Sequence, residues 1–300
     1  MKAILVLNTH AGAAQTAAHP TAEELRSAFA PLGVSLAVFE VNGAGVDDAV
    51  CNAISRRPDA ILTGGGDGTI STAARHLADG DIPLGALPLG TLNHFARDLG
   101  LPPAWREAAR VLATAPTRRI DVAEVNGRIF VNNCSLGSYG EAVRRRDALR
   151  REHGHGKWRA MARASWQVFR TLRRFRFQID TPEGHSTIRS PFAVVANNRY
   201  SGNVFDTSLR PRLDAGRLWI YAARVQTRWS LLRLVAQGLA RSIDEAEGLD
   251  VRDSTAATIT VARGPLPLAC DGEAVNLVPP FRFRIRPRAL PVLAPPPAAS

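Results

Sequence analysis

Over residues 1–122, short apolar runs alternate with segments of helical periodicity, a rhythm typical of βα units and a parallel sheet. Buried strands are predicted at residues 3–8, 34–41, 59–66 and 82–90. Helices are predicted from Thr21, from Asp47, over 70–79, from Thr91 to Gly100, and from Pro103 to about Ala113. Thr21 and Glu24 have the spacing of a capping box, which marks the first of these helices most clearly.

Beyond Asp121 the apolar positions mostly change to the alternation of strands. Asn126-Gly127 predicts a hairpin turn. Strands are predicted at 175–180, 191–198, 217–225, 257–263 and 281–286, with one more in the tail from Pro291, and helices at about 157–174 and 229–241. We therefore expect an α/β chain of two domains, residues 1–122 and a β-rich domain of residues 123–286, with residues 287–300 returning to the first domain before a frayed end.

The composition fits a globular protein, because 45% of the 300 residues are hydrophobic and 22% are charged. No apolar stretch reaches the length that spans a bilayer, and the apolar run after Lys2 is too short for a signal peptide. These features predict a cytoplasmic protein. Cys51, Cys134 and Cys270 have no disulfide or zinc spacing, and we expect three buried thiols in a reducing compartment.

The formal net charge of +11 indicates an anionic partner, and most of it comes from one segment. Residues 144–176 contain 12 basic and 2 acidic residues, a local charge of 12 minus 2, or +10. Apolar residues at helical spacing predict a basic amphipathic helix at about 157–174, which can lie on an anionic bilayer or pack on its own domain. No nucleic-acid-binding motif is present, so a membrane surface is favoured over nucleic acid.

Glycine-rich loops follow the predicted strands of the first domain. The segment 63–69 reads TGGGDGT between a strand and a helix, where backbone N–H groups can approach a phosphate. It is neither a Walker A loop nor a dinucleotide fingerprint. Residues 89–98 and 8–12 occupy similar positions after other strands. Because parallel strands end at one edge of their sheet, we expect these loops to converge on one crevice.

A pair of carboxylates lies late in the chain, at Asp271 and Glu273 on either side of Gly272. On a strand or tight turn, one could act as a general base while the other orients it or holds a metal-bound water. Taken alone, the spacing favours a surface turn.

These segments, in this order and spacing, resemble the bacterial soluble diacylglycerol kinase-like lipid kinases, relatives of the sphingosine kinases. The resemblance covers nearly the whole chain and rests on residues 8–12, 65–69, 87–96, Asp121 and 271–273. GGDGT by itself is shared with NAD kinases and the phosphofructokinase superfamily. The segments around 87–96 and 271–273 favour the lipid kinase branch.

The resemblance implies a three-layer N-terminal α/β domain of the NAD kinase/diacylglycerol kinase type and a C-terminal β-sandwich-like domain. It implies ATP and Mg²⁺ as cofactors. The nucleotide-binding residues would be Asn8, Gly12, Gly65, Gly66, Asp67, Gly68, Thr69, Thr91 and Asn93. The catalytic residues would be Glu273, which deprotonates the lipid hydroxyl, together with Asp271 and Asp67. Asp67 and Asp121 would belong to the water network around Mg²⁺.

The chain departs from the family pattern at several positions. His94 replaces an acid of the magnesium network, and Thr72 replaces a common glutamate. Ala215 replaces an aspartate of a structural Mg²⁺ loop, which argues against that second site unless Asp214 compensates.

The sequence leaves several functions open. A lipid kinase at the inner face of the membrane, acting on diacylglycerol, a sphingoid base, ceramide or phosphatidylglycerol in phospholipid metabolism, fits best. A soluble-metabolite kinase of the NAD kinase type and a nucleotide-binding regulator without turnover are the alternatives. A homodimer is compatible with the sequence.

Overall fold

The computed structural model describes residues 1–9, 20–138, 140, 173–201, 210–224, 230, 248–261 and 266–296. One compact unit comprises Met1–Val122, Arg212–Asp214 and Pro287–Ser300, and the other comprises Ala123–Pro211 and Ala215–Arg286. Apart from Arg173 and Arg174, which are exposed and not helical, the predicted basic helix lies outside the described residues. The predicted helix at 229–241 lies outside them too, except for Ser230.

The first unit is built on a parallel sheet in the order β2-β1-β3-β4. Its strands are β1 (Lys2–Asn8), β2 (Ser35–Val41), β3 (Ala60–Gly65) and β4 (Leu84–Pro88). Every residue of β3 and β4 is buried, as expected of parallel strands that are covered on both faces. The end of β16 (Phe281–Leu293) adds to β4 through the pair Val292 and Leu84.

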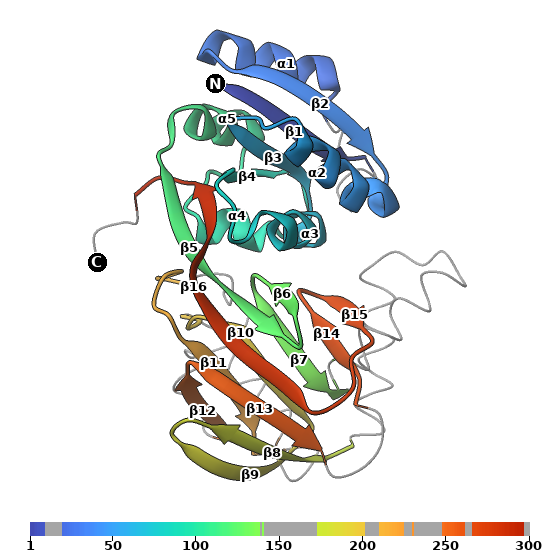
Figure 1. Ribbon diagram of the computed structural model, residues 1–300, viewed down its shortest axis with the longest axis vertical. Coiled ribbons are helices and arrows are strands. Elements are labelled where there is room, and N and C mark those ends of the chain that lie inside the picture. Colours follow the sequence, from blue (N-terminus) through green and yellow to red (C-terminus); the bar gives the residue numbers. More distant parts are fainter. Residues whose placement is uncertain are drawn as a thin grey trace. The chain divides into compact units, whose positions relative to one another are not determined.

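Helices cover both faces of this sheet, which gives the predicted three layers (Figure 1). They are α1 (Ala22–Phe29), α2 (Val46–Ser55), α3 (Asp67–Leu77), α4 (His94–Asp98) and α5 (Trp105–Thr114), with short 3₁₀ turns η2 (Ala30–Leu32) and η3 (Gly43–Gly45). The helices α1 and α5 pack together, and α2 packs against α3 on the strands β1 and β3.

The first residues of the helices show which local sequence signals determine where a helix begins. The capping box of α1 is confirmed, since Thr21 Oγ1 accepts the N–H of Glu24 (3.2 Å) and Glu24 Oε2 accepts the N–H of Thr21 (2.8 Å). Two other predictions were wrong. The helix α3 starts at Asp67 rather than residue 70, because an acidic residue is favourable in a first turn. The helix α5 starts at Trp105 rather than at Pro103, because Ala104 is still extended (ψ 118°).

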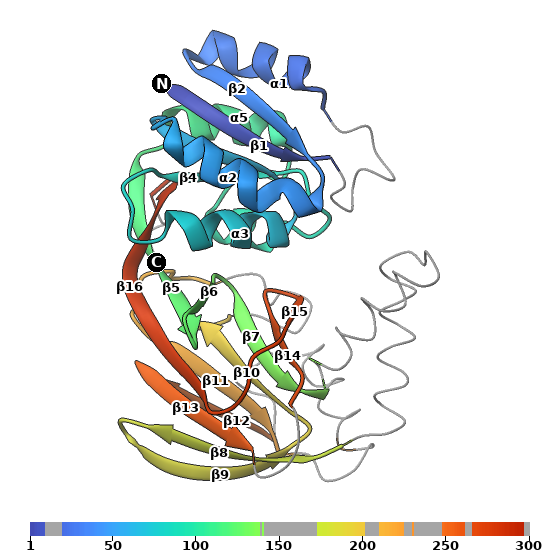
Figure 2. The same cartoon turned by 45° about the vertical axis from the view of Figure 1, so that its right-hand side comes forward.

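The described residues of the second unit form antiparallel sheets, shown in Figure 2. One sheet joins the start of β16 to β13, β8 and β9, with β5 and β6 on the other side of β16, and the second has the order β12-β11-β10-β7-β14-β15. The strands are the end of β5 (Thr117–Val125), which begins in the first unit, and β6 (Arg128–Phe130), β7 (Asn133–Gly137), β8 (Phe175–Thr181), β9 (Gly184–Ser190), β10 (Phe192–Asn197), β11 (Leu218–Ala223), β12 (Leu249–Ser254), β13 (Ala256–Val261), β14 (Leu268–Cys270) and β15 (Glu273–Val275).

An apolar core shared by strands of both sheets holds this unit together, and Phe130, Phe177 and Phe281 in it are fully buried. This is the β-sandwich-like architecture that the resemblance implies. The predicted hairpin is confirmed, because Asn126 (φ 47°) and Gly127 (φ 85°) link β5 to β6 with positive φ at both positions.

The strand prediction missed β9 and β12, in which polar and charged residues interrupt the alternation, and the short strands β14 and β15. The prediction also ended a strand before Pro287, where the structure has the continuous strand β16. The strand continues there because Arg288 adopts a left-handed conformation (φ 52°) and its N–H donates to the Asp121 carboxylate (2.9 Å). A side-chain acceptor thus replaces a partner in the ladder.

The cysteine prediction was correct for Cys134 and Cys270, which are buried opposite each other on β7 and β14 with their Sγ atoms 2.8 Å apart. Burial raises the pKa of the Cys134 thiol, so this thiol stays protonated at neutral pH. The prediction was wrong for Cys51, which is exposed on α2 because it lies on the side of that helix that points away from the sheet, toward His76 of α3.

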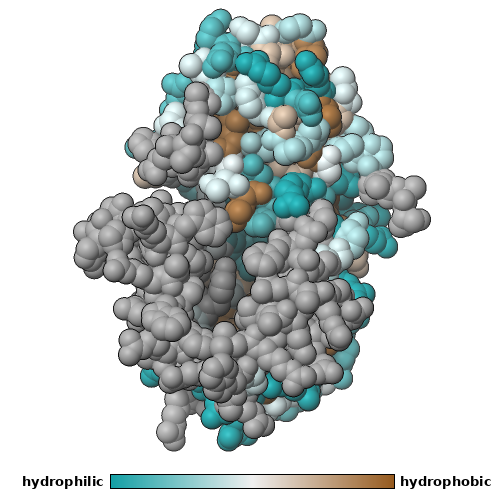
Figure 3. Space-filling model, turned by 180° about the vertical axis from the view of Figure 1, so that it is seen from behind, coloured by the Kyte–Doolittle hydropathy of each residue, from teal (hydrophilic) through white to brown (hydrophobic). Residues whose placement is uncertain are grey.

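No helix among the described residues is long and apolar enough to cross a bilayer. The large apolar side chains exposed there are Met1, Leu92 and Val278. On the face shown in Figure 3, hydrophobic residues of the described surface are interspersed with hydrophilic ones.

Candidate functional site

The ends of β1, β3 and β4 meet along one rim of the first unit, as the three loops predict. Asn8, at the end of β1, donates from Nδ2 to Thr69 Oγ1 of α3 (3.0 Å). Gly90, after β4, packs so closely that a Cβ atom there would lie 2.5 Å from Gly66 Cα. The described parts of all three loops are therefore linked, while Gly12 lies outside the described residues.

The amino end of α3 is the part of this rim best suited to an anion. Gly65 ends β3, and Gly66 is the extended N-cap, which has no side chain to cap the helix. Asp67, Gly68 and Thr69 form the first turn. The N–H of Thr69 donates to the Gly66 carbonyl (2.9 Å), whereas the N–H groups of Asp67 and Gly68 have no acceptor within the helix. These donors and the positive end of the helix dipole form a phosphate-binding arrangement.

Asp67 also links this helix to the next loop, because its Oδ1 accepts the N–H of Phe95 in the first turn of α4 (3.2 Å). Asn93 closes the loop before α4: its Oδ1 accepts the N–H of Gly90 (2.8 Å) and its Nδ2 donates to the Gly90 carbonyl (3.0 Å). The predicted cap at Thr91 was wrong. Asn93 is left-handed (φ 51°), α4 begins only at His94, and Thr91 is exposed in the turn.

His94 lies at the start of α4 with a buried Nδ1 that has no hydrogen-bond partner within the described part of the chain. Buried polar atoms in native proteins are almost always paired, so a bound group that supplies a partner fits this position. Mg²⁺ prefers oxygen ligands and usually retains waters and substrate phosphates beside one or two carboxylates. The Asp67 carboxylate fits this donor set, and the His94 imidazole does not.

Asp121 lies in β5 and is fully buried. Its Oδ1 accepts the N–H of Arg288, and its own N–H donates to the Leu213 carbonyl (2.7 Å), so it links β5 to the end of β16 and to the 212–214 segment within the first unit. Its place in a magnesium network remains a prediction. Asp214 pairs with the guanidinium of Arg212 (Nε to Oδ1, 3.2 Å).

The late carboxylate pair lies at a two-residue turn between β14 and β15 in the second unit, with Asp271 in the turn and Glu273 directly after it. Asp271 (φ 49°) and Gly272 (φ 78°) form the turn, and Asp-Gly is favoured at such positions. The Asp271 carboxylate accepts three backbone N–H groups, from Val131 (2.9 Å), Asn132 (2.8 Å) and Asn133 (3.2 Å). Asp271 thus fixes the turn to the β6–β7 connection.

Glu273 is the first residue of β15, and 48% of its side chain is exposed. Its Oε2 lies 3.6 Å from Nη2 of Arg128 on β6. The two carboxylates therefore differ in environment: Asp271 is bound by the backbone, whereas Glu273 is accessible to a substrate and lies beside a cation. Because it is accessible, Glu273 is the better placed of the two for proton transfer.

The sequence did not predict a polar network that lies next to the Asp271-Gly272 turn. The nearly buried Arg210 donates from Nη1 to the carbonyls of Val131 (2.5 Å) and Asn197 (2.9 Å), and from Nη2 to Asn132 Oδ1 (2.9 Å). Asn197 Nδ2 donates to Val131 O as well (2.9 Å). The available sequence signal was the Asn-Asn pair at 132–133 and again at 197–198, each at a strand end.

Gly90→Ala tests the rim. The new Cβ would meet Gly66 Cα at 2.5 Å, Asn93 Oδ1 at 2.8 Å and Gly65 O at 3.0 Å, so the loops after β3 and β4 must separate. We expect nucleotide affinity to fall by about tenfold or more, because small misplacements at a preorganised site are costly. Calorimetric titration with ATP measures it, and Gly45→Ala, where a Cβ meets no atom closer than 3.5 Å, is a control glycine that is not among the predicted nucleotide-binding residues. Equal ATP affinity of the Gly90→Ala variant and the wild type would contradict the prediction that the nucleotide binds at this rim.

Two protein families match this chain. Residues 2–125 match the diacylglycerol kinase catalytic domain. Residues 132–294 match the YegS C-terminal NAD kinase beta sandwich-like domain.

Curated relatives agree with these matches. The chain is 30% identical over 297 residues to the diacylglycerol kinase of Mycobacterium tuberculosis, covering 95% of this chain and 91% of that protein. It is also 30% identical over 247 residues to a Chromohalobacter salexigens protein named "Probable lipid kinase YegS-like", covering 78% and 76%. The crystal structure of a diacylglycerol kinase from Bacillus anthracis str. Sterne superposes with a TM-score of 0.71 at 18% identity, over 99% of this chain and 98% of that one, which supports the fold.

Proposed function

Because this chain belongs to the lipid kinase family of the diacylglycerol kinase and YegS type, we propose that it transfers the γ-phosphate of ATP to a hydroxyl group of a membrane lipid. The observation that carries this proposal is the rim on which the amino end of α3, Asn8 and the loop at Gly90 meet. Phosphoryl transfer depends mainly on positioning and on neutralising charge, and both are properties of such a rim.

The residues of the rim would act on the nucleotide in different ways. The N–H groups at the start of α3 would donate to phosphate oxygens, and the contacts of Asn8 with Thr69 and of Asp67 with α4 hold these donors in place. Mg²⁺, when bound, would neutralise the charge that develops on the phosphates, and Asp67 is the carboxylate that would hold it. The partnerless Nδ1 of His94 would gain a phosphate or hydroxyl partner.

Glu273 would remove the proton from the lipid hydroxyl while the hydroxyl oxygen attacks the γ-phosphorus of ATP. Its exposure allows a substrate to approach, and Arg128 Nη2 lies 3.6 Å from one of its carboxylate oxygens. Asp271 would act as a positioning residue for Glu273, because its three backbone contacts fix the turn on which Glu273 lies.

The acceptor would be a lipid of the diacylglycerol, sphingoid or ceramide class, reached from the inner face of the membrane. The basic segment 144–176 supports this, since each basic residue near anionic lipid contributes about 1 kcal/mol. Arg284 and Arg286 of β16 contribute less to such binding, because both already pair with the Glu124 carboxylate (2.9 and 3.3 Å).

The membrane contact gives a prediction of its own. The protein should float with vesicles that contain anionic phosphatidylglycerol, remain behind with neutral phosphatidylcholine vesicles, and be released as salt screens the charges. Density-gradient flotation measures this. A variant with Lys157, Arg159, Arg163 and Arg170 changed to glutamine should lose flotation while keeping ATP affinity. Equal flotation with both kinds of vesicle would refute the electrostatic contact.

The kinase proposal is tested by incubating the protein with Mg²⁺ and ATP labelled at the γ-phosphate. One arm contains extracted lipids in mixed micelles, and a parallel arm contains NAD⁺. A labelled lipid supports the proposal and identifies the acceptor class. Label on NAD⁺ alone would favour the soluble-metabolite kinase, and ATP binding without any transfer would favour a regulator.

A further inference from the structure

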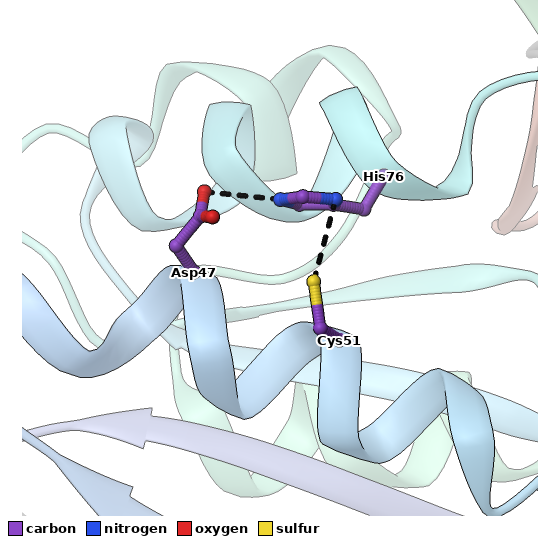
Figure 4. Close-up of side chains that lie close together, drawn as sticks. All are labelled: Asp47, Cys51 and His76. Atoms are coloured by element: carbon purple, nitrogen blue, oxygen red, sulfur yellow. Dashed lines mark hydrogen bonds and ion pairs between the residues drawn. The ribbon is translucent and has the colours of Figure 1, made fainter.

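A thiol, an imidazole and a carboxylate lie together between α2 and α3, with one donor atom of each within 4.8 Å of the others and the imidazole bonded to both neighbours (Figure 4). Cys51 Sγ is 3.7 Å from Nδ1 of His76, and Nε2 of the same ring is 3.0 Å from Asp47 Oδ1. Asp47 and Cys51 are four residues apart on α2 and so share one side of that helix, while His76 comes from the last turn of α3.

The order of these groups fixes the position of the imidazole proton. Asp47 is half-exposed, and its hydrogen bond with His76 holds the pKa of this carboxyl below its ordinary value, against a smaller opposing effect of burial. An ionised carboxylate can only accept a hydrogen bond, so Nε2 must carry a proton and donate it. In the neutral ring, Nδ1 then has a lone pair directed toward the Cys51 thiol.

A thiol next to a base that is itself oriented by a third group has the arrangement of an activated nucleophile. We propose that Cys51 is a covalent modification site that reacts with low-molecular-weight disulfides, with His76 as its base and Asp47 as the residue that orients His76. Cys51 is exposed, so a small reagent can reach the sulfur.

The reaction balances as a thiol–disulfide exchange. The Cys51 proton passes to His76 Nδ1, the Cys51 sulfur attacks one sulfur of the reagent disulfide, and the disulfide bond breaks. The second reagent sulfur leaves as a thiolate and takes the proton from His76. One mixed disulfide and one free thiol form, and no other oxidant is consumed.

The same three side chains are also a possible metal donor set, but their arrangement favours the proton relay. A histidine that chelates an ion together with Cys51 and Asp47 would direct one nitrogen toward the position shared with both. Here the two ring nitrogens face different partners, one the sulfur and the other the carboxylate. Arg75 Nη2 also lies 3.7 Å from the same Asp47 oxygen and supplies positive charge there.

The 300-residue chain carries its own internal reference, because Cys134 and Cys270 are buried. Oxidised glutathione is added at neutral pH, and mixed disulfides are followed by intact mass and located by peptide mapping. We expect a single adduct, at Cys51, and none in the Cys51→Ser variant. His76→Gln should slow the reaction at least about tenfold, and Asp47→Asn should slow it less, since it disturbs only the orientation of the base.

Equal rates of modification in the wild type and His76→Gln would overturn the proposal. An increase in the wild-type rate after treatment with a chelator would also overturn it, because it would indicate that a bound metal had been protecting the thiol. Reaction in denaturant, where all three thiols are accessible in every variant except Cys51→Ser, shows that a slow variant has not lost its thiol to oxidation. Matching thermal melting curves show that the variants are folded. The site lies within the first unit and its readout is thiol chemistry, so the result does not depend on the kinase proposal.

Discussion

Replacing Glu273 by glutamine is expected to lower the rate of lipid phosphorylation about 10²- to 10⁴-fold, the usual contribution of a general base. Glutamine keeps the size of the side chain but cannot take up a proton. The contact with Arg128 loses its ionic character, but the side chain is half-exposed, so the fold should remain intact. Initial rates with labelled ATP and lipid in mixed micelles measure the loss.

The structure offers a matched control in Glu23, an exposed glutamate on α1 that contacts only a neighbouring arginine on the same helix among the ion pairs of the described residues. Glu23→Gln should retain full activity. Both variants should bind ATP as the wild type does, because the rim belongs to the first unit and Glu273 to the second. Undiminished transfer by Glu273→Gln would exclude Glu273 as the base and leave the proton to another group.

The sequence predicted the rim correctly because glycines report on backbone geometry. A glycine is required wherever a Cβ would strike a neighbouring backbone, and Gly90 meets that condition against Gly66. The capping box of α1 was also predicted correctly, because both of its partners lie within four residues of sequence. Signals that act over a short stretch of chain can be recognised without the fold.

Contacts between distant segments could not be predicted in this way. The bond from Phe95 to Asp67 spans 28 positions, and it belongs to the interactions that shift the start of α4 away from Thr91. Arg210 reaches Asn132 across 78 positions. No local pattern marks an arginine whose charge is satisfied by carbonyl and amide oxygens, and its burial follows only from the way the β6–β7 connection and the end of β10 meet.

The carboxylate turn shows the same division within three residues. The sequence predicted a turn at Asp-Gly and an acid beside it, but it could not say which acid the backbone would use. The structure directs three N–H groups to Asp271 and none of these to Glu273, so Asp271 supports the turn while Glu273 remains accessible. The structural role thus falls to Asp271 and the chemical role to Glu273. Replacing Asp271 should therefore lower the stability of the fold, whereas replacing Glu273 should leave it unchanged.

Replacing Asp271 by alanine should destabilise the second unit by about 3 to 5 kcal/mol. Three N–H groups, of Val131, Asn132 and Asn133, lose a charged acceptor, and each such bond contributes about 1.5 to 3 kcal/mol, without full additivity. Alanine is also poorly suited to the left-handed backbone at this position (φ 49°), whereas aspartate and asparagine tolerate it. Denaturant unfolding of the full chain, followed by fluorescence, measures the loss.

Asp271→Asn separates the two causes. Asparagine tolerates the left-handed backbone and keeps one acceptor oxygen for the N–H groups of Asn132 and Asn133, but it places a donor against Val131. An intermediate loss of about 2 kcal/mol is expected. Asp81→Ala, which removes a fully exposed carboxylate paired with Arg119, should leave stability unchanged. If Asp271→Ala were as stable as Asp81→Ala, the three bonds would not hold the turn, and Asp271 would have to be explained by its chemistry alone.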